Sequence, residues 1–180
     1  MATSGCPAVV TLELRKAAIA MDLRRIVIAG IGASLVIAML EMIFEAIIPD
    51  GAGFFGPPIA IGATIVRDLQ GSANPIPFDL GAFGIGLVGH MMNSIILAAI
   101  FGLFVSRRTM SPGATVMAGM AWGAAVFVGM WFVVVPIVDP VMHNLNAAAF
   151  FVAHLMWGAA LGLIWTRFGA STEQDHAHAH

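Results

Sequence analysis

The chain has 180 residues, of which 59% are hydrophobic and only 10% are charged, and its mean hydropathy is +0.93. A soluble domain carries about 25% charged residues, so the composition excludes an ordinary soluble protein and indicates a membrane protein. The net charge of −2 and the lack of a basic patch exclude a nucleic-acid-binding protein, and the single cysteine excludes an internal disulfide.

The two ends of the chain are predicted to lie outside the membrane. Residues 1–25 form a cytoplasmic or interfacial segment, in which residues 11–25 are either an amphipathic helix on the membrane surface or a solvated lead-in. Residues 169–180 form a flexible tail. Its alternating histidines are a candidate site for a transition metal, although a solvated tail is the favoured interpretation: His176, His178 and His180.

Hydropathy predicts an all-α protein with a transmembrane domain over residues 26–168. A membrane-spanning helix needs about 20 apolar residues, and four stretches qualify: 26–48, 80–105, 114–138 and 147–165. The long outer loop, residues 49–79, contains a short interfacial helix over Pro57–Gly71, which we expect on the membrane surface or over the mouth of the bundle.

The basic residues predict the orientation of the four spans. Seven of the eight Lys and Arg residues fall on one side of the spans, and only Arg67 falls on the other. Because cytoplasmic loops are enriched in Lys and Arg, both termini are predicted to be cytoplasmic, in a bacterial inner membrane. Five ionisable residues near the span ends then face outward, where we expect them to be solvated: Asp50, Asp68, Asp79, Asp139 and His143.

The four spans resemble a duplicated helical hairpin. Gly32-Ala33 and Pro49 recur at one offset as Gly123-Ala124 and Pro140, and a histidine motif recurs in the second and fourth spans. Two hairpins in the same orientation predict a pseudo-twofold axis along the membrane normal. Glycines four residues apart in the third and fourth spans predict close helix packing, within the chain or with another subunit: Gly119, Gly123, Gly158 and Gly162.

Four ionisable residues inside the spans form the candidate site: Glu41, Glu45, His90 and His154. Each histidine is about nine residues, or roughly 13 Å, into its span, and the two glutamates share one helical face at a comparable depth. Ionisable groups inside a membrane usually pair with one another or mark an ion, proton or cofactor site. Asn93 lies one turn from His90 and is expected to orient its ring.

Two short motifs, Gly89-His90-Met91-Met92-Asn93 and His154-Leu155-Met156-Trp157, resemble those of the YagU-type small bacterial inner-membrane proteins. The resemblance implies a first span, a long Pro-rich outer loop, a Gly-His-x-x-Asn helix and a second hairpin that ends in a His-Leu-x-Trp helix. It adds weight to His90, Asn93, His154 and Trp157 as site residues. It implies no activity and does not extend to Glu41 or Glu45.

Three hypotheses follow for the polar cluster, in order of preference. The first is binding or conduction of a transition metal ion or protons. The second is a structural or accessory role, in which the side chains bond across helices. The third is haem b held by His90 and His154. An enzyme is disfavoured because no hydrolase or phosphate-binding motif occurs. The predicted partners are the lipid bilayer and a homo-oligomer or larger membrane complex.

Overall fold

The computed structural model describes the backbone of residues 7–177 and the side chains of residues 23–168. The described residues contain helices and loops but no strand, which confirms the all-α prediction. The predicted tail site at His176, His178 and His180 lies outside the described side chains. The elements in chain order are α1 (Pro7–Ile47), α2 (Gly56–Gly62), η1 (Arg67–Gly71), α3 (Leu80–Val105), α4 (Pro112–Gly129), η2 (Met130–Val134), α5 (Val135–Val138), η3 (Pro140–Asn144) and α6 (Ala147–Ala177).

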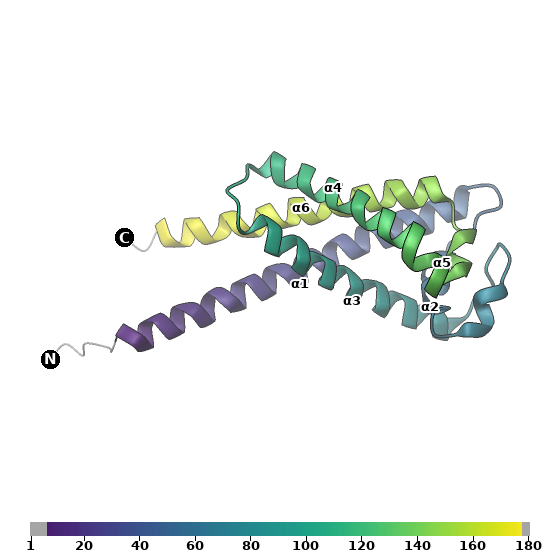
Figure 1. Ribbon diagram of the computed structural model, residues 1–180, viewed down its shortest axis with the longest axis horizontal. Coiled ribbons are helices and arrows are strands. Elements are labelled where there is room, and N and C mark those ends of the chain that lie inside the picture. Colours follow the sequence, from purple (N-terminus) through teal and green to yellow (C-terminus); the bar gives the residue numbers. More distant parts are fainter. Residues whose placement is uncertain (1–6, 178–180) are drawn as a thin grey trace.

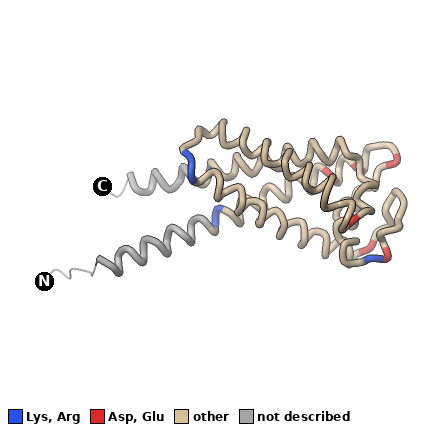
Figure 2. The backbone as a smooth tube through the Cα atoms, in the orientation of Figure 1, with Lys and Arg blue, Asp and Glu red and all other residues tan. Residues whose placement is uncertain are grey.

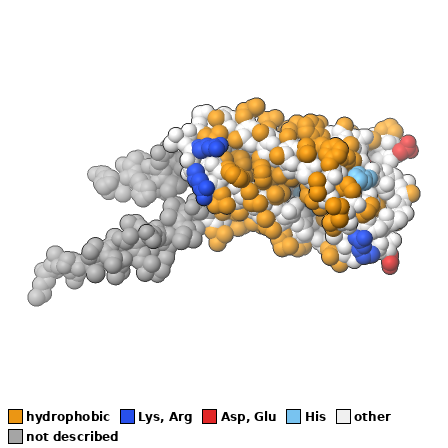
Figure 3. Space-filling model, viewed as in Figure 1, with side chains coloured by type: hydrophobic (Ala, Val, Ile, Leu, Met, Phe, Trp, Pro, Cys, Tyr) orange, Lys and Arg blue, Asp and Glu red, His pale blue; other side chains and the backbone are white. Residues whose placement is uncertain are grey.

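Within the part of the chain that the structure describes, four helical segments are long and apolar enough to cross a membrane: Leu23–Ile47, Leu80–Val105, Pro112–Val138 and Ala147–Phe168. They agree closely with the four predicted spans. Hydrophobic side chains cover the middle of the molecule, with basic side chains at one end and mostly acidic ones at the other (Figures 2 and 3). This apolar belt between two charged ends identifies an integral membrane protein.

The four long helices pack in the order α3, α1, α6 and α4 (Figure 1). α1 lies against both α3 and α6, and α4 lies along α6, whereas α3 and α4 make very little contact. A closed bundle with the predicted twofold symmetry needs α3 and α4 to pack together as α1 and α6 do. The packing therefore departs from that symmetry, and one side of the bundle is open.

Glycines bring α4 and α6 into close contact, and the predicted glycine pairs face each other within one chain. A Cβ atom on Gly119 would lie 2.1 Å from the Gly158 carbonyl oxygen, and one on Gly123 would lie 2.2 Å from the His154 carbonyl oxygen. Neither space admits a side chain. Small residues at this spacing let helix backbones approach closely in membranes, and here they fix the position of His154 relative to α4.

The outer loop is more deeply packed than the sequence indicates. The predicted helix over Pro57–Gly71 is divided into α2 and η1, and α2 is largely buried against α3 rather than lying on the membrane surface. A Cβ atom on Gly86 of α3 would lie 1.8 Å from the Pro58 carbonyl oxygen. α2 therefore closes the outer end of the bundle from within and forms part of its core with Val135 and Val141.

The sequence pattern predicts one continuous helix for the third span. The structure differs, because η2 is a π-helical segment within it. The N–H of Val135 donates to the carbonyl oxygen of Met130, five residues earlier. Pro136 follows at once and has no N–H of its own to donate. A widened turn beside a proline is a common way to accommodate the missing bond, and such segments are frequent at functional sites.

Candidate functional site

A cavity of about 840 Å³ lies at the open side of the bundle, in the half nearer to α2. Its wall includes residues of all four long helices, of the loop after α2, and of η2 and α5. Most of these residues are apolar. Few groups on the wall are polar, and three of the four predicted site residues, Glu41, His90 and His154, are among them. The others are the side chains of Thr64, Asn93, Ser94 and Asp139 and the indole N–H of Trp157.

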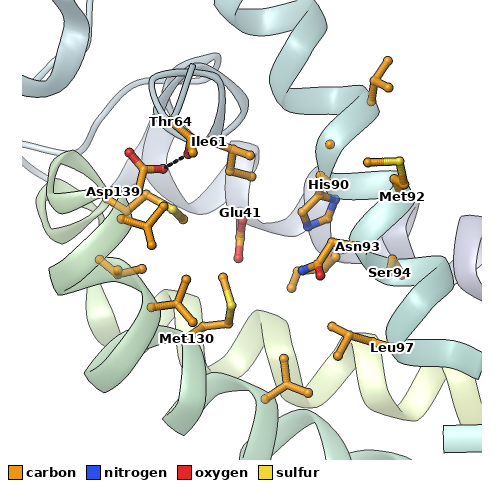
Figure 4. Close-up of a pocket in the computed structure, with 18 of the residues that line it drawn as sticks. Glu41, Ile61, Thr64, His90, Met92, Asn93, Ser94, Leu97, Met130 and Asp139 are labelled. Atoms are coloured by element: carbon orange, nitrogen blue, oxygen red, sulfur yellow. Dashed lines mark hydrogen bonds between the residues drawn. The ribbon is translucent and has the colours of Figure 1, made fainter. Parts of the chain in front are cut away.

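Glu41 projects from α1 into the middle of this space, between Asp139 and His90 (Figure 4). Its side chain is buried, and its Oε1 atom has no hydrogen-bond partner among the described residues. A buried polar atom without a partner costs free energy. Such an atom beside a cavity is therefore ready to bind a proton, a cation or a hydrogen-bond donor.

His154 lies beside this free oxygen. Its Nδ1 atom lies 3.9 Å from Oε1 of Glu41 but only 2.8 Å from the Phe150 carbonyl oxygen. A carbonyl oxygen can only accept, so Nδ1 of His154 carries the hydrogen and donates it to Phe150. In the neutral ring Nε2 is then an acceptor. The Phe150 ring, with its centroid 4.3 Å from that of the imidazole, helps to hold it in place.

His90 reaches the cavity from α3 and is linked to α1. Its Nδ1 atom lies 2.9 Å from Oγ of Ser34, a hydrogen bond that joins the two helices. Asn93, which was expected to orient this ring, is exposed and lies on the cavity wall beside His90 (Figure 4). Ser34 thus makes the contact that sequence reasoning assigned to Asn93. Its place on the same face of α1 as Glu41 was the available signal.

Glu45 does not join the cluster, although it lies one turn from Glu41. Its Oε2 atom accepts the N–H of Ala52 at 2.8 Å, and its Oε1 atom accepts the N–H of Asn146 at 2.7 Å. The carboxyl group thereby ties the end of α1 to the outer loop and to the start of α6. Glu45 has a structural role, and the four-residue site of the sequence is reduced to Glu41, His90 and His154.

Trp157 also has a packing role rather than a free position in the cavity. Its indole N–H donates to Oγ of Ser94 at 2.8 Å, and Ser94 donates to the Gly30 carbonyl oxygen at 2.7 Å. This chain of bonds connects α6, α3 and α1 at the cavity wall. Ser94 is buried and was given no role by sequence reasoning; its position four residues after His90 was the only signal.

Asp139 forms the outer boundary of the cavity and is buried, not solvated as expected for an acid at the end of a span. Its Oδ2 accepts from Thr64 at 2.9 Å (Figure 4). Its Oδ1 accepts from Gln70. Burial raises the pKa of Asp139, against the opposing effects of these two hydrogen bonds and of the nearby Arg67. Asp50, Asp68 and His143 are exposed as predicted, whereas Asp79 is half-buried and accepts the N–H of Ala82 at the start of α3.

The donor set does not form a preorganised metal site. Among the described residues, no three His, Cys, Asp or Glu side chains converge closely enough to hold a metal ion together. Transition metals in proteins usually take three or more such ligands. The site offers instead one free carboxylate oxygen and two imidazoles around an apolar space.

No family model, curated protein or solved structure matches this chain. The chemistry of the site therefore follows from its own residues alone.

The exposed residues at the edge of the cavity indicate where it opens. On α3, the wall residues Val88 and Met92 are 66% and 59% exposed, and Val134 and Val138 on the other side are also exposed. The space thus opens sideways between α3 and α4, at the level of the membrane.

Proposed function

We propose that this protein is a bacterial inner-membrane protein that exchanges a proton at Glu41 within a laterally open cavity. The single observation that supports this is the buried Oε1 atom of Glu41, which has no partner among the described residues. A carboxyl group in a poorly hydrated site is costly as a free anion and becomes acceptable when it gains a proton or a cation. In this proposal the Glu41 carboxyl group binds a proton and a cation in turn.

Two imidazole groups and a second carboxyl group share the cavity with the Glu41 carboxyl group. His154 faces it from α6, with Nδ1 3.9 Å from Oε1, and His90 faces the same cavity from α3. Asp139 lies on the wall toward the outer end. Carboxyl and imidazole groups in sequence through a membrane protein are typical of proton relays. Protons would reach Glu41 from the outer side, past Asp139.

Haem b is a second candidate, and one observation favours it. Both Nδ1 atoms are held, by Ser34 and by the Phe150 carbonyl, and no described hydrogen bond reaches Nε2 of either ring. A histidine fixed through Nδ1 with Nε2 free is the arrangement that haem ligation uses. A Soret band that disappears in a His90→Ala/His154→Ala variant would establish this alternative, whereas a colourless protein would remove it.

We further propose that the chain belongs among the YagU-type inner-membrane proteins and that both of its ends are cytoplasmic. Support for the first statement is that His90 and His154, the histidines of the two resembling motifs, both line the cavity. Support for the second is the position of the arginines. Arg24 and Arg25 lie at the start of the first span, Arg107 and Arg108 follow the end of the second, and Arg67 lies in the loop between these two spans. The basic residues are thus concentrated at one end of the spans, as the described backbone shows (Figure 2).

Infrared difference spectroscopy on the purified protein tests the proton exchange directly. Spectra recorded between about pH 5 and pH 9 should contain the band of a protonated carboxyl that titrates and that is missing in Glu41→Gln. Asp139→Asn is the matched control and should keep this band, because it leaves the Glu41 carboxyl in place. A spectrum in which Glu41→Gln changes nothing would refute the proposal.

A further inference from the structure

We propose that the cavity binds a lipophilic monovalent cation, a molecule with one positive charge on an apolar body, which enters from the bilayer between α3 and α4. The inference rests on the proposed function, since the cation would occupy the place of the proton at Glu41. It adds a class of ligand and a route of entry.

The route follows from the sparse contact between α3 and α4. Where α4 packs on α6 and α1 packs on α3, glycines bring the two backbones close together. Between α3 and α4 the wall residues Ile85, Val88 and Met92 remain exposed, although they lie inside a membrane span. Their surroundings at that depth are lipid, so a ligand dissolved in the hydrocarbon reaches the cavity without crossing a polar layer.

The charge of the ligand follows from the groups that face the cavity. Its titratable wall residues are Glu41, Asp139, His90 and His154, and no Lys or Arg occurs among the described residues of the wall. Glu45, although close on α1, is engaged with backbone N–H groups. The free Oε1 of Glu41 thus requires a positive charge or a donor. An anionic ligand would have no counter-ion there.

The apolar body follows from the size and lining of the space. A volume of about 840 Å³ is far larger than one metal ion needs and falls in the range of about 300–1,000 Å³ that is typical of small-molecule sites. Phe150 and Trp157 contribute aromatic surface to the cavity wall. Aromatic faces attract organic cations. A hydrated inorganic ion, by contrast, would leave most of this apolar surface without contacts.

Equilibrium binding of tetraphenylphosphonium to the detergent-purified full-length protein tests the inference. Wild type should bind this cation and release protons into a weakly buffered solution as it does so. Glu41→Gln should lower the affinity by about tenfold or more, as expected for loss of an ion pair worth at least about 1.4 kcal/mol.

A second pair of variants keeps the carboxyl group and tests the entrance. Val88→Trp adds bulk at the exposed edge of the cavity and should slow or abolish binding. Ile96→Trp is the matched control, because Ile96 is a similarly exposed residue of α3 that does not line the cavity. Both substitutions occur at exposed positions and should leave the fold intact, as the thermal transition of each variant would verify.

The possible results separate the two proposals. Binding that is lost in Glu41→Gln and in Val88→Trp but kept in Ile96→Trp would support the inference. Wild type that binds no tetraphenylphosphonium, while the Glu41 infrared band still titrates, would overturn the inference and leave the proton exchange standing. Binding that is equal in all variants would also overturn it, and the absence of both binding and the infrared band would refute both proposals.

Discussion

Oε1 of Glu41 lies 3.9 Å from Nδ1 of His154, which is too far for a hydrogen bond, and the hydrogen on that nitrogen is already donated to Phe150. The two residues are therefore neighbours without being partners. A tight pair would satisfy both groups and would indicate a structural bond. The spacing found here leaves the carboxyl group available to something outside the protein chain.

Replacement of either α1 glutamate by glutamine should have a different effect on the free energy of unfolding. Glu45→Gln should lower the free energy of unfolding by about 1–3 kcal/mol, because the amide presents a donor to one of two buried N–H groups. Glu41→Gln should leave the stability within about 1 kcal/mol of wild type or increase it, since it removes an unsatisfied acid. Unfolding in mixed detergent measures both. Equal losses in the two variants would contradict the assigned roles.

The seam between α4 and α6 should be sensitive to a single methyl group. Gly123→Ala should destabilise the protein by about 1–3 kcal/mol, because the new Cβ would overlap the His154 backbone. Gly129→Ala is the control: nothing lies within 4 Å of its Cβ position, and alanine in place of glycine favours the helix by up to about 1 kcal/mol. Comparable unfolding curves for the two variants would show that the helices are not packed at Gly123.

Asp139 should make the stability depend on pH in one direction. Because burial raises its pKa above the ordinary value of 3.8, the folded state holds this proton more tightly than the unfolded state. The stabilising effect of the proton is complete below pH 3.8 and is lost as the pH rises through the raised pKa. Asp139→Asn cannot ionise and should lack this decline. Thermal transitions of both proteins from acidic to neutral pH should diverge; parallel curves would be evidence against a perturbed Asp139.

The orientation in the membrane can be tested with single cysteines in a Cys6→Ser background. Ala73→Cys lies on an exposed part of the outer loop, and Thr109→Cys is exposed between α3 and α4. If both termini are cytoplasmic, a membrane-impermeant maleimide added to intact cells should label the cysteine at position 73. It should label the one at position 109 only after lysis. The reverse pattern would invert the proposed topology.

Hydropathy and small-residue spacing were sufficient to predict the helices but not all of their contacts. The spans and the glycine seam around Gly119 and Gly123 depend on local composition, which the sequence displays directly. The burial of α2 and the open side between α3 and α4 depend on how distant segments meet. Pro136 was the visible signal for the π-helical segment, since a proline inside a span removes one backbone bond.

The candidate site was predicted in part for the same reason. Glu41, His90 and His154 were placed at one depth by counting residues, and all three line one cavity. Counting residues along the helix cannot show that Glu41 and Glu45 have different contacts, because the two share a helical face. What separates them is the approach of the Ala52 and Asn146 N–H groups to Glu45. For the same reason, the contact of Ser34 with His90 and the burial of Asp139 were not predicted, because both depend on how distant segments pack.

The four long helices form a row with two free edges instead of a closed ring. α4, at one edge, is attached mainly by its glycine contacts with α6 and, beyond the π-helical segment, by the bonds of Asp139. A tilt of α4 would change the width of the cavity at Val126, while Val135, beyond the π-helical segment, stays packed in the core with α2. The wall that α4 contributes is therefore the side of the cavity that could yield to a bulkier ligand.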